Sequence, residues 1–126
     1  MGRSVSVLKD EEHEHPVPTE WRPKFTEIVA ALKAENFSLH GIENVAELDD
    51  DTAAGIARNI SDYNCTLAAL PHESWDTSVC QWQLKYWEVL VDLFTDEEGR
   101  SDLVLHAEVF ETDGGFAFNV HFVYVP

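Results

Sequence analysis

Basic residues are scarce in this chain. It has 8 lysine and arginine residues against 24 aspartate and glutamate residues, which gives a formal net charge of −16 over 126 residues. A field of this sign repels nucleic acids and anionic membrane surfaces and attracts cationic partners. Nucleic acid is therefore not expected as a partner, because phosphate binding draws its affinity mainly from lysine and arginine. Two interpretations of the acidity stay open, a charge-selected partner and simple solubility.

Cysteine and long apolar runs are scarce as well. Cys65 and Cys80 are too few for a disulfide framework, and we expect both to be buried free thiols in a reducing compartment. The apolar segments are too short to cross a bilayer. Near the N-terminus, Val5, Val7 and Leu8 are interrupted and soon followed by charge, which does not fit a secretory signal. These absences predict a cytoplasmic protein without membrane contact.

The familiar catalytic signatures are missing too. The sequence has no Gly-rich phosphate loop, no HExxH, no GxSxG and no CxxC. His72 and Cys80 are near each other in the sequence, but a Cys–His pair requires proximity in space. No cofactor is expected, and an enzyme is the less favoured class.

The N-terminal segment differs in composition from the rest of the chain. It is polar and contains the like-charge run KDEEHEHPVP. This composition predicts a flexible acidic tail or an extended arm over residues 1–19, followed by a single domain over residues 20–126. His13 and His15 are poor metal ligands in such a segment, because ordering a flexible chain costs entropy.

Helices are predicted in the first half of the domain. Apolar residues recur at helical spacing at Trp21, Phe25, Ile28, Val29 and Leu32. They predict a first helix over about residues 20–35. The acidic triplet Asp49–Asp51 begins a second helix, because these side chains cap free N–H groups and favour the positive end of the helix dipole. A further helical turn is expected over His72–Thr77.

Strands are predicted in the second half. We expect a first strand over about Gln81–Thr95, with room for a bulge, because this stretch is aromatic and β-rich. Asp113-Gly114 is a strong hairpin signal between the two strands that follow. Counting back from it pairs Val109 with Phe118, Leu105 with Phe122, and His106 with His121, while the longer loop Thr95–Ser101 pairs Phe94 with Asp102 and Leu90 with His106.

This register places one apolar face across three strands. The face must be buried, and the two N-terminal helices are the available cover. The sequence therefore predicts an α+β fold, in which two N-terminal helices pack on one face of a C-terminal antiparallel β-meander of at least three strands.

The opposite face of the predicted sheet carries polar side chains among apolar ones. The polar members are Glu88, Asp92, His106, Glu108, Asn119 and His121. Two facing histidines with carboxylates nearby make His106 and His121 weak metal candidates, and the same groups suit acid–base chemistry. A flat sheet face lacks the concavity of most ligand sites. We therefore interpret it as a candidate partner-binding face.

A candidate recognition loop precedes the second of these strands. It consists of Glu97, Glu98 and Arg100. The alternative is an ordinary turn, in which Gly99 takes a positive φ and Ser101 or Asp102 bonds locally.

Three stretches, Phe25–Leu32, Trp87–Leu103 and Val120–Pro126, resemble a family of small uncharacterised bacterial domains. The resemblance covers most of the chain after residues 1–19. The family has no assigned activity, so the resemblance implies no catalytic residue. In small size and acidity the chain is also similar to cytoplasmic immunity proteins that neutralise toxins.

These observations favour a small acidic, non-enzymatic protein-binding module, of the immunity or antitoxin type, with a basic protein as partner. The alternative is a metal-dependent or acid–base enzyme that uses the histidines and carboxylates of the exposed sheet face. A third hypothesis is a homodimer through the last strand, Phe116–Val125, because an unpaired edge with little charge invites pairing.

Overall fold

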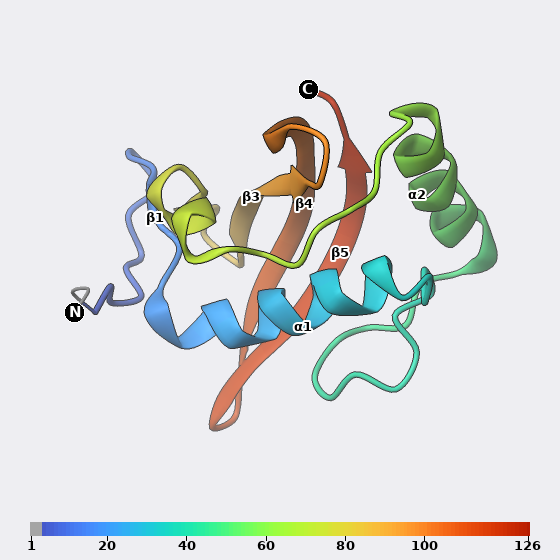
Figure 1. The fold of residues 1–126 in the computed structure, drawn as a ribbon. Helices are drawn as coiled ribbons and strands as arrows, with labels where there is room; N and C mark the ends of the chain where they lie inside the picture. The colour runs from blue at the N-terminus through green and yellow to red at the C-terminus, as the bar shows by residue number, and fades with distance from the viewer. Residues whose placement is uncertain (1–3) are drawn as a thin grey trace.

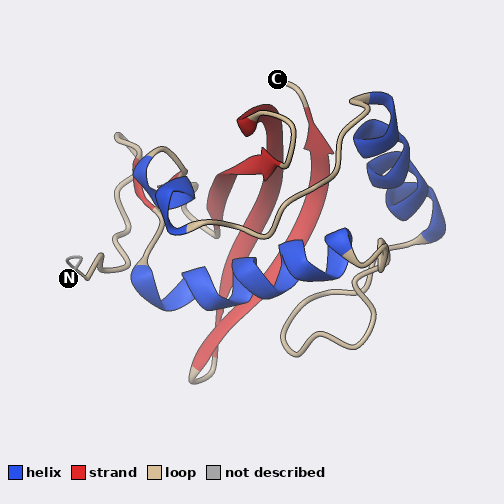
Figure 2. Cartoon of the chain, viewed as in Figure 1, coloured by secondary structure: helices blue, strands red, loops and turns tan. Residues whose placement is uncertain are grey.

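The computed structural model describes residues 4–126 and has an α+β fold (Figure 1, Figure 2). The elements are β1 (His15–Pro16), the 3-10 helix η1 (Thr19–Trp21), α1 (Arg22–Lys33), α2 (Asp50–Asp62), the 3-10 helix η2 (His72–Asp76), β2 (Val79–Trp82), β3 (Trp87–Thr95), β4 (Gly99–Thr112) and β5 (Gly115–Tyr124). The strands form one five-stranded antiparallel sheet in the order β1-β2-β3-β4-β5. The predicted fold class is confirmed. No helix of the described residues is long and apolar enough to span a membrane.

Helix α1 covers the inner face of the sheet, and Figure 1 shows it lying across the strands. Its apolar stripe is buried, as the sequence predicts. Pro23 stands in the first turn, where its missing N–H costs no helix hydrogen bond. The side chain of Phe25 meets Phe118 of β5 edge-to-face, with ring centroids 5.4 Å apart. Burying an aromatic side chain of this size stabilises the fold by about 1.5–3 kcal/mol.

Helix α2 packs against β5, the last strand of the sheet (Figure 1). Its N-cap is Asp49, which accepts a hydrogen bond from the Thr52 amide at 2.7 Å, so the predicted role of the acidic triplet is confirmed. Gly55 is buried on the side facing β5, and a Cβ at this position would lie 3.9 Å from Phe122 Cε1. A methyl group at this position would make ordinary van der Waals contact, so the packing of α2 on β5 does not itself require glycine.

The outer edge of β5 is occupied within the chain. The backbone of Phe118 exchanges hydrogen bonds with the segment before α2, at Asn44 and Ala46. Farther along the strand, the Asn59 amide donates to the Val123 carbonyl at 2.8 Å. The chain's own loop and helix therefore occupy this edge at Phe118 and Val123, and the homodimer through the last strand stays a prediction.

Residues 4–18 form an extended arm along the sheet. The sequence left two alternatives for this segment, a flexible tail or an extended arm, and its contacts with the sheet are those of an arm. The Trp87 indole N–H donates to the Leu8 carbonyl at 2.8 Å, and Lys9 lies 2.9 Å from Glu111. His15 and Pro16 then pair with β2 as the short strand β1. Composition alone misses these contacts, since a polar segment can bind through its backbone carbonyls.

The region predicted as one strand over Gln81–Thr95 is two strands. β2 and β3 are joined by a tight reversal in which the Gln83 amide donates to the Tyr86 carbonyl at 2.7 Å. Leu84 takes a positive φ of 74° at the tip. The expectation of a single strand fails because the reversal contains no glycine, proline or asparagine, which are the usual signals of a turn.

The Asp113-Gly114 turn is confirmed, and so is the register beside it, where Val109 pairs with Phe118. Farther from the turn the register shifts, because β5 contains a bulge at His121. Leu105 therefore faces Val123 rather than Phe122, and Phe122 faces His106. The expectation of a buried Phe122 is wrong. Its side chain is 49% exposed, and Val123 is buried in its place.

A second irregularity separates β3 from β4 near their loop. Leu90 pairs with His106 as predicted, but Phe94 pairs with Arg100 instead of Asp102. A bulge between Asp92 and Phe94 causes this shift. Between the pairs Asp92–Val104 and Phe94–Arg100, β4 contains two residues more than β3, and no periodic pattern reveals where such an insertion lies.

Two identical substitutions on β5 test this register. Phe118→Ala should lower the free energy of unfolding by about 3–5 kcal/mol, since truncating a buried aromatic side chain leaves a cavity. Phe122→Ala should cost less than half as much, because half of its side chain already contacts water. Urea denaturation of both variants measures the two costs. Equal costs would mean that Phe122 is buried and that the bulge is absent.

The arm gives a pH-dependent prediction. One carboxylate oxygen of Asp10 lies 2.8 Å from His15 Nε2 and 3.1 Å from His13 Nδ1. The bond to His15, together with the Glu12 amide and His13, lowers the pKa of Asp10 from 3.8 to about 2. A depressed carboxyl pKa stabilises the docked arm above the unfolded pKa, and this contribution is lost as the pH falls through the folded pKa.

Hydrogen exchange of the arm amides should therefore speed up as the pH falls from 3.8 towards 2, after correction for the intrinsic pH dependence of exchange. The variant Asp10→Asn should lack this component. If wild type and variant showed the same acid response, Asp10 would not anchor the arm.

Candidate functional site

The predicted partner-binding residues lie on the face of the sheet that α1 does not cover, here called the outer face. They alternate with buried inner-face residues along β3, β4 and β5. Glu88 pairs with Glu108, which in turn pairs with Asn119. Like charges directly opposite each other in a sheet are unfavourable. The pair of glutamates therefore favours a nearby cation.

Two histidines stand beside these glutamates. The rings of His106 and His121 stack with centroids 5.3 Å apart and an interplanar angle of 27°. His106 Nε2 lies 3.5 Å from Glu88, and His121 Nε2 lies 2.9 Å from Glu108. The bulge at His121 keeps the two histidines adjacent even though the predicted register shifts at this point.

The ring nitrogens facing the glutamates are not satisfied by hydrogen bonds. Although His121 Nε2 is close to the Glu108 carboxylate, neither this atom nor His106 Nε2 meets a partner in hydrogen-bond geometry among the described residues. The short distance between His121 Nε2 and Glu108 is not a hydrogen bond, because a donor and an acceptor that meet at a poor angle gain little bonding energy. Each pair gains ionic attraction only when its histidine is protonated.

Asp92 is on the same face but has a different role. Its carboxylate accepts a hydrogen bond from the Thr77 hydroxyl. Its backbone amide donates to Ser78 Oγ at 2.9 Å, and its carbonyl accepts from Ser74 Oγ at 2.7 Å. These bonds satisfy the edge of β3 beyond the end of β2 and attach η2 to the sheet. The structure therefore groups the other predicted residues around the histidines, with Asp92 apart from them.

The candidate metal ligands do not converge on one point. Each histidine faces its own glutamate, and within residues 4–126 no group of three or more histidine, cysteine, aspartate or glutamate side chains is arranged to hold a metal ion. The row is therefore a set of carboxylates with a histidine beside each, in which the side chain of Glu88 is 43% exposed and that of Glu108 is 18% exposed.

The residues of the candidate recognition loop have partners inside the chain. Glu97 accepts a hydrogen bond from the Thr66 amide at 2.8 Å, and Glu98 accepts one from the Tyr63 hydroxyl. These bonds attach the connector after α2 to the turn between β3 and β4, and the bond from Thr66 lowers the pKa of Glu97. Arg100 is exposed and has no ion pair within the described residues.

Both cysteines are free, but the expectation that both are buried holds only for Cys80, since Cys65 is half-buried. Cys80 is buried on the inner face, and burial raises its pKa from 9.0 to about 11. Burial and the nearby Glu97 and Glu98 raise the pKa of Cys65 as well. A nucleophilic cysteine needs a depressed pKa, so neither thiol is suited to catalysis.

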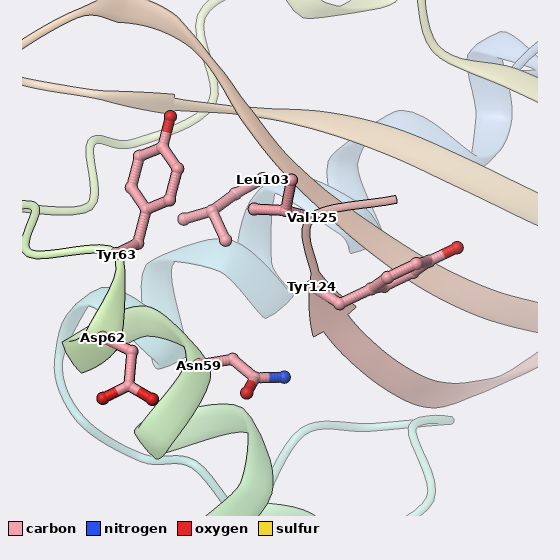
Figure 3. Close-up of a pocket in the computed structure, with 6 residues that line it drawn as sticks. All are labelled: Asn59, Asp62, Tyr63, Leu103, Tyr124 and Val125. Carbon is pink, nitrogen blue, oxygen red and sulfur yellow. The ribbon is translucent and has the colours of Figure 1, made fainter.

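A hollow that the sequence did not predict lies between the end of α2 and the end of β5, and Figure 3 shows it. Its volume is about 350 Å³, and it is lined by Asn59, Asp62, Tyr63, Leu103, Tyr124 and Val125. Figure 3 shows the rings of Tyr63 and Tyr124 pointing in different directions, with Leu103 and Val125 between them. The hollow exists because α2 packs on β5, a contact between distant segments that no local pattern reveals.

The fold and the outer face together define a small α+β domain with a charged, partly apolar sheet surface. The chain belongs to the family described as Domain of unknown function (DUF7668), whose model matches residues 29–126. The match starts within α1, so it includes the whole sheet except β1. No curated protein and no solved structure matches the chain.

The thiols provide a test of the inner face. At neutral pH, Cys80 should react with a thiol reagent only when the protein unfolds, because its pKa of about 11 keeps it protonated and burial blocks access. Ellman's reagent in native buffer and in urea measures the difference, with Cys65→Ser used to isolate Cys80. Rapid reaction of Cys80 in native buffer would contradict both its burial and its raised pKa.

Proposed function

We propose that this domain is a non-enzymatic protein-binding module that uses its outer face to bind a basic protein. The observation that carries the proposal is the composition of this face. A row of histidines and carboxylates lies next to partly exposed aromatic side chains, which are Tyr86 and Phe110, with ring centroids 5.5 Å apart, and Phe122 of β5. Interfaces between proteins combine apolar contact area with polar groups in this way.

Charge supports the choice of a basic partner. The net charge of −16 attracts cationic proteins over distance, while Glu88 and Glu108 offer two adjacent carboxylates on the face itself. Bringing a lysine or arginine to this pair would relieve the repulsion between the glutamates. Complementary charges of this kind raise association rates and exclude wrong partners.

An immunity or antitoxin-like inhibitor is the form of this function that we favour. Enzymes that act on nucleic acids have basic substrate clefts, and a small acidic domain can occupy such a cleft by presenting carboxylates in place of phosphates. Free thiols in both cysteines suit a cytoplasmic location for this encounter.

An acid–base or metal-dependent enzyme is the second candidate. The Nε2 atoms of His106 and His121 favour it, because no hydrogen bond takes up their bonding capacity. Both atoms are buried, however, so a substrate would reach them only after a movement of the side chains. The hollow that reaches His121 also contains Asn119 and Thr52, but it is open and lies at the margin between β5 and the start of α2. Enzyme sites generally enclose their substrate more fully.

Matched charge variants test the proposal. Glu88→Gln/Glu108→Gln removes two charges from the outer face, and Glu20→Gln/Glu43→Gln removes two exposed charges elsewhere. Tagged wild type and variants would be used to capture proteins from cells that naturally produce this chain, with quantitative mass spectrometry at low and moderate salt. The outer-face variant should lose a basic partner that the control variant retains.

The partner then serves in a direct assay. Under this proposal, stoichiometric wild-type protein should inhibit the partner's activity on nucleic acid, and the outer-face variant should inhibit it less. Equal losses by both variants would indicate general charge attraction. Retention of the partner by the outer-face variant would place the interface elsewhere.

A further inference from the structure

The side chain of Lys9 in the arm contacts two groups of the sheet at once. Its ammonium lies 5.2 Å from the ring centroid of Trp82 and 2.9 Å from the carboxylate of Glu111. A cation over an indole ring is attracted by the negative potential of the ring face, and the carboxylate accepts a charged hydrogen bond. Trp82 and Glu111 together therefore form a binding site for an alkylammonium group, here called the lysine site, and Lys9 fills it from within the chain.

Both residues of the lysine site are positioned by the sheet. Trp82 ends β2 and packs against the buried ring of Trp87, with ring centroids 4.4 Å apart. Glu111 lies near the end of β4 and pairs with Phe116 of β5, which packs against the core. Strand pairing and core packing therefore set the positions of both residues without the arm.

Lys9 is held weakly at the lysine site. Its side chain is 52% exposed, and that of Glu111 is 55% exposed. Ion pairs and cation–π contacts that are open to water contribute little to stability. Because a lysine ammonium sits on a flexible four-carbon stem, a rotation of this one side chain opens the site to solvent. The site can therefore exchange its occupant while the arm stays bound through the Leu8 carbonyl.

The lysine site is separate from the outer face. Residues opposite each other in an antiparallel pair lie on the same side of a sheet, and Trp82 is opposite Trp87, which is buried on the inner face. The family model matches residues 29–126. The two residues of the site thus lie within the matched part of the chain, whereas Lys9, which fills the site, lies outside it.

We propose that Trp82 and Glu111 bind a lysine side chain of another protein, and that Lys9 blocks this site as an internal competitor until such a lysine displaces it. The class of ligand follows from the occupant, which is an ammonium group on an unbranched alkyl chain. The net charge of −16 attracts proteins that carry lysines. The arm keeps Lys9 at a high effective concentration beside the site, so weakly bound or dilute lysines are excluded.

Removal of the internal competitor tests this inference with a ligand of defined chemistry. Nα-acetyl-lysine N-methylamide would be titrated into isotope-labelled protein while NMR follows the indole N–H signal of Trp82. Lys9→Ala should lower the apparent dissociation constant about fivefold relative to wild type, because an occupied site binds only through the fraction that is open. Nα-acetyl-norleucine N-methylamide, which has the alkyl chain without the charge, should leave the signal unshifted.

Lys85→Ala is the matched control variant. Lys85 is exposed and forms no ion pair within residues 4–126, so its removal changes the net charge by the same amount as Lys9→Ala. This variant should bind the lysine ligand as wild type does. Adding Glu111→Gln to Lys9→Ala should abolish the gain in affinity. Adding Glu88→Gln/Glu108→Gln instead should preserve it, which separates this site from the outer face of the proposed function.

Three outcomes would overturn the inference. One is an unshifted Trp82 signal in Lys9→Ala, and another is equal affinity in Lys9→Ala and Lys85→Ala, which would mean that the ligand responds to net charge alone. The third is a gain that survives Glu111→Gln, since the carboxylate would then have no part in the site. The indole signal of Trp87, whose N–H donates to the Leu8 carbonyl, reports whether the arm stays docked. Release of the arm would also free the site of Lys9, so the comparison at Trp82 holds in either case.

Discussion

The contact between Trp21 and Trp87 is the interaction on which the rest of the structure depends. Both rings are fully buried and meet edge-to-face at 5.2 Å, and Phe116 of β5 lies against both. The indole N–H of Trp87 also bonds to the Leu8 carbonyl of the arm. One cluster therefore joins the arm, the start of α1 and two strands. Burial is therefore concentrated on the inner face, where helix, arm and strands meet.

The helices, the Asp113-Gly114 hairpin and the inner face could be predicted because each depends on residues close in sequence. Asp49 caps α2 through an amide three residues away, and the Gly114 turn sets the pairs next to it. The arm, the packing of α2 on β5 and the hollow beside Tyr63 depend on contacts across more of the chain. The bulge at His121 could not be predicted either, because the residues on both sides of it fit either face.

Part of the candidate site could be predicted, again because that part depends on residues close to one another in the sequence. Glu88 and Glu108 face each other because they lie in a register that short-range alternation determines. His106 and His121 lie together because the bulge leaves their rings stacked after the register has shifted. Asp92 shares the face but is used by η2, whose serine and threonine hydroxyls satisfy the edge of β3. A residue's face follows from the alternating pattern, whereas its partners depend on what the rest of the chain brings to it.

Two of the places where local rules fail leave a large apolar side chain exposed. The bulge in β5 turns Phe122 outward, and the strained reversal before β3 turns Leu84 outward. A sequence selected for stability alone would place a glycine or asparagine at the reversal and a polar residue at the exposed bulge. Both positions instead hold large apolar side chains, and Phe122 is paired with His106 of the outer face. The two exposures differ in kind, because Phe122 lies against α2 beside Gly55 and is half-buried by the chain itself, whereas Leu84 stands at the tip of a hairpin and is 65% exposed.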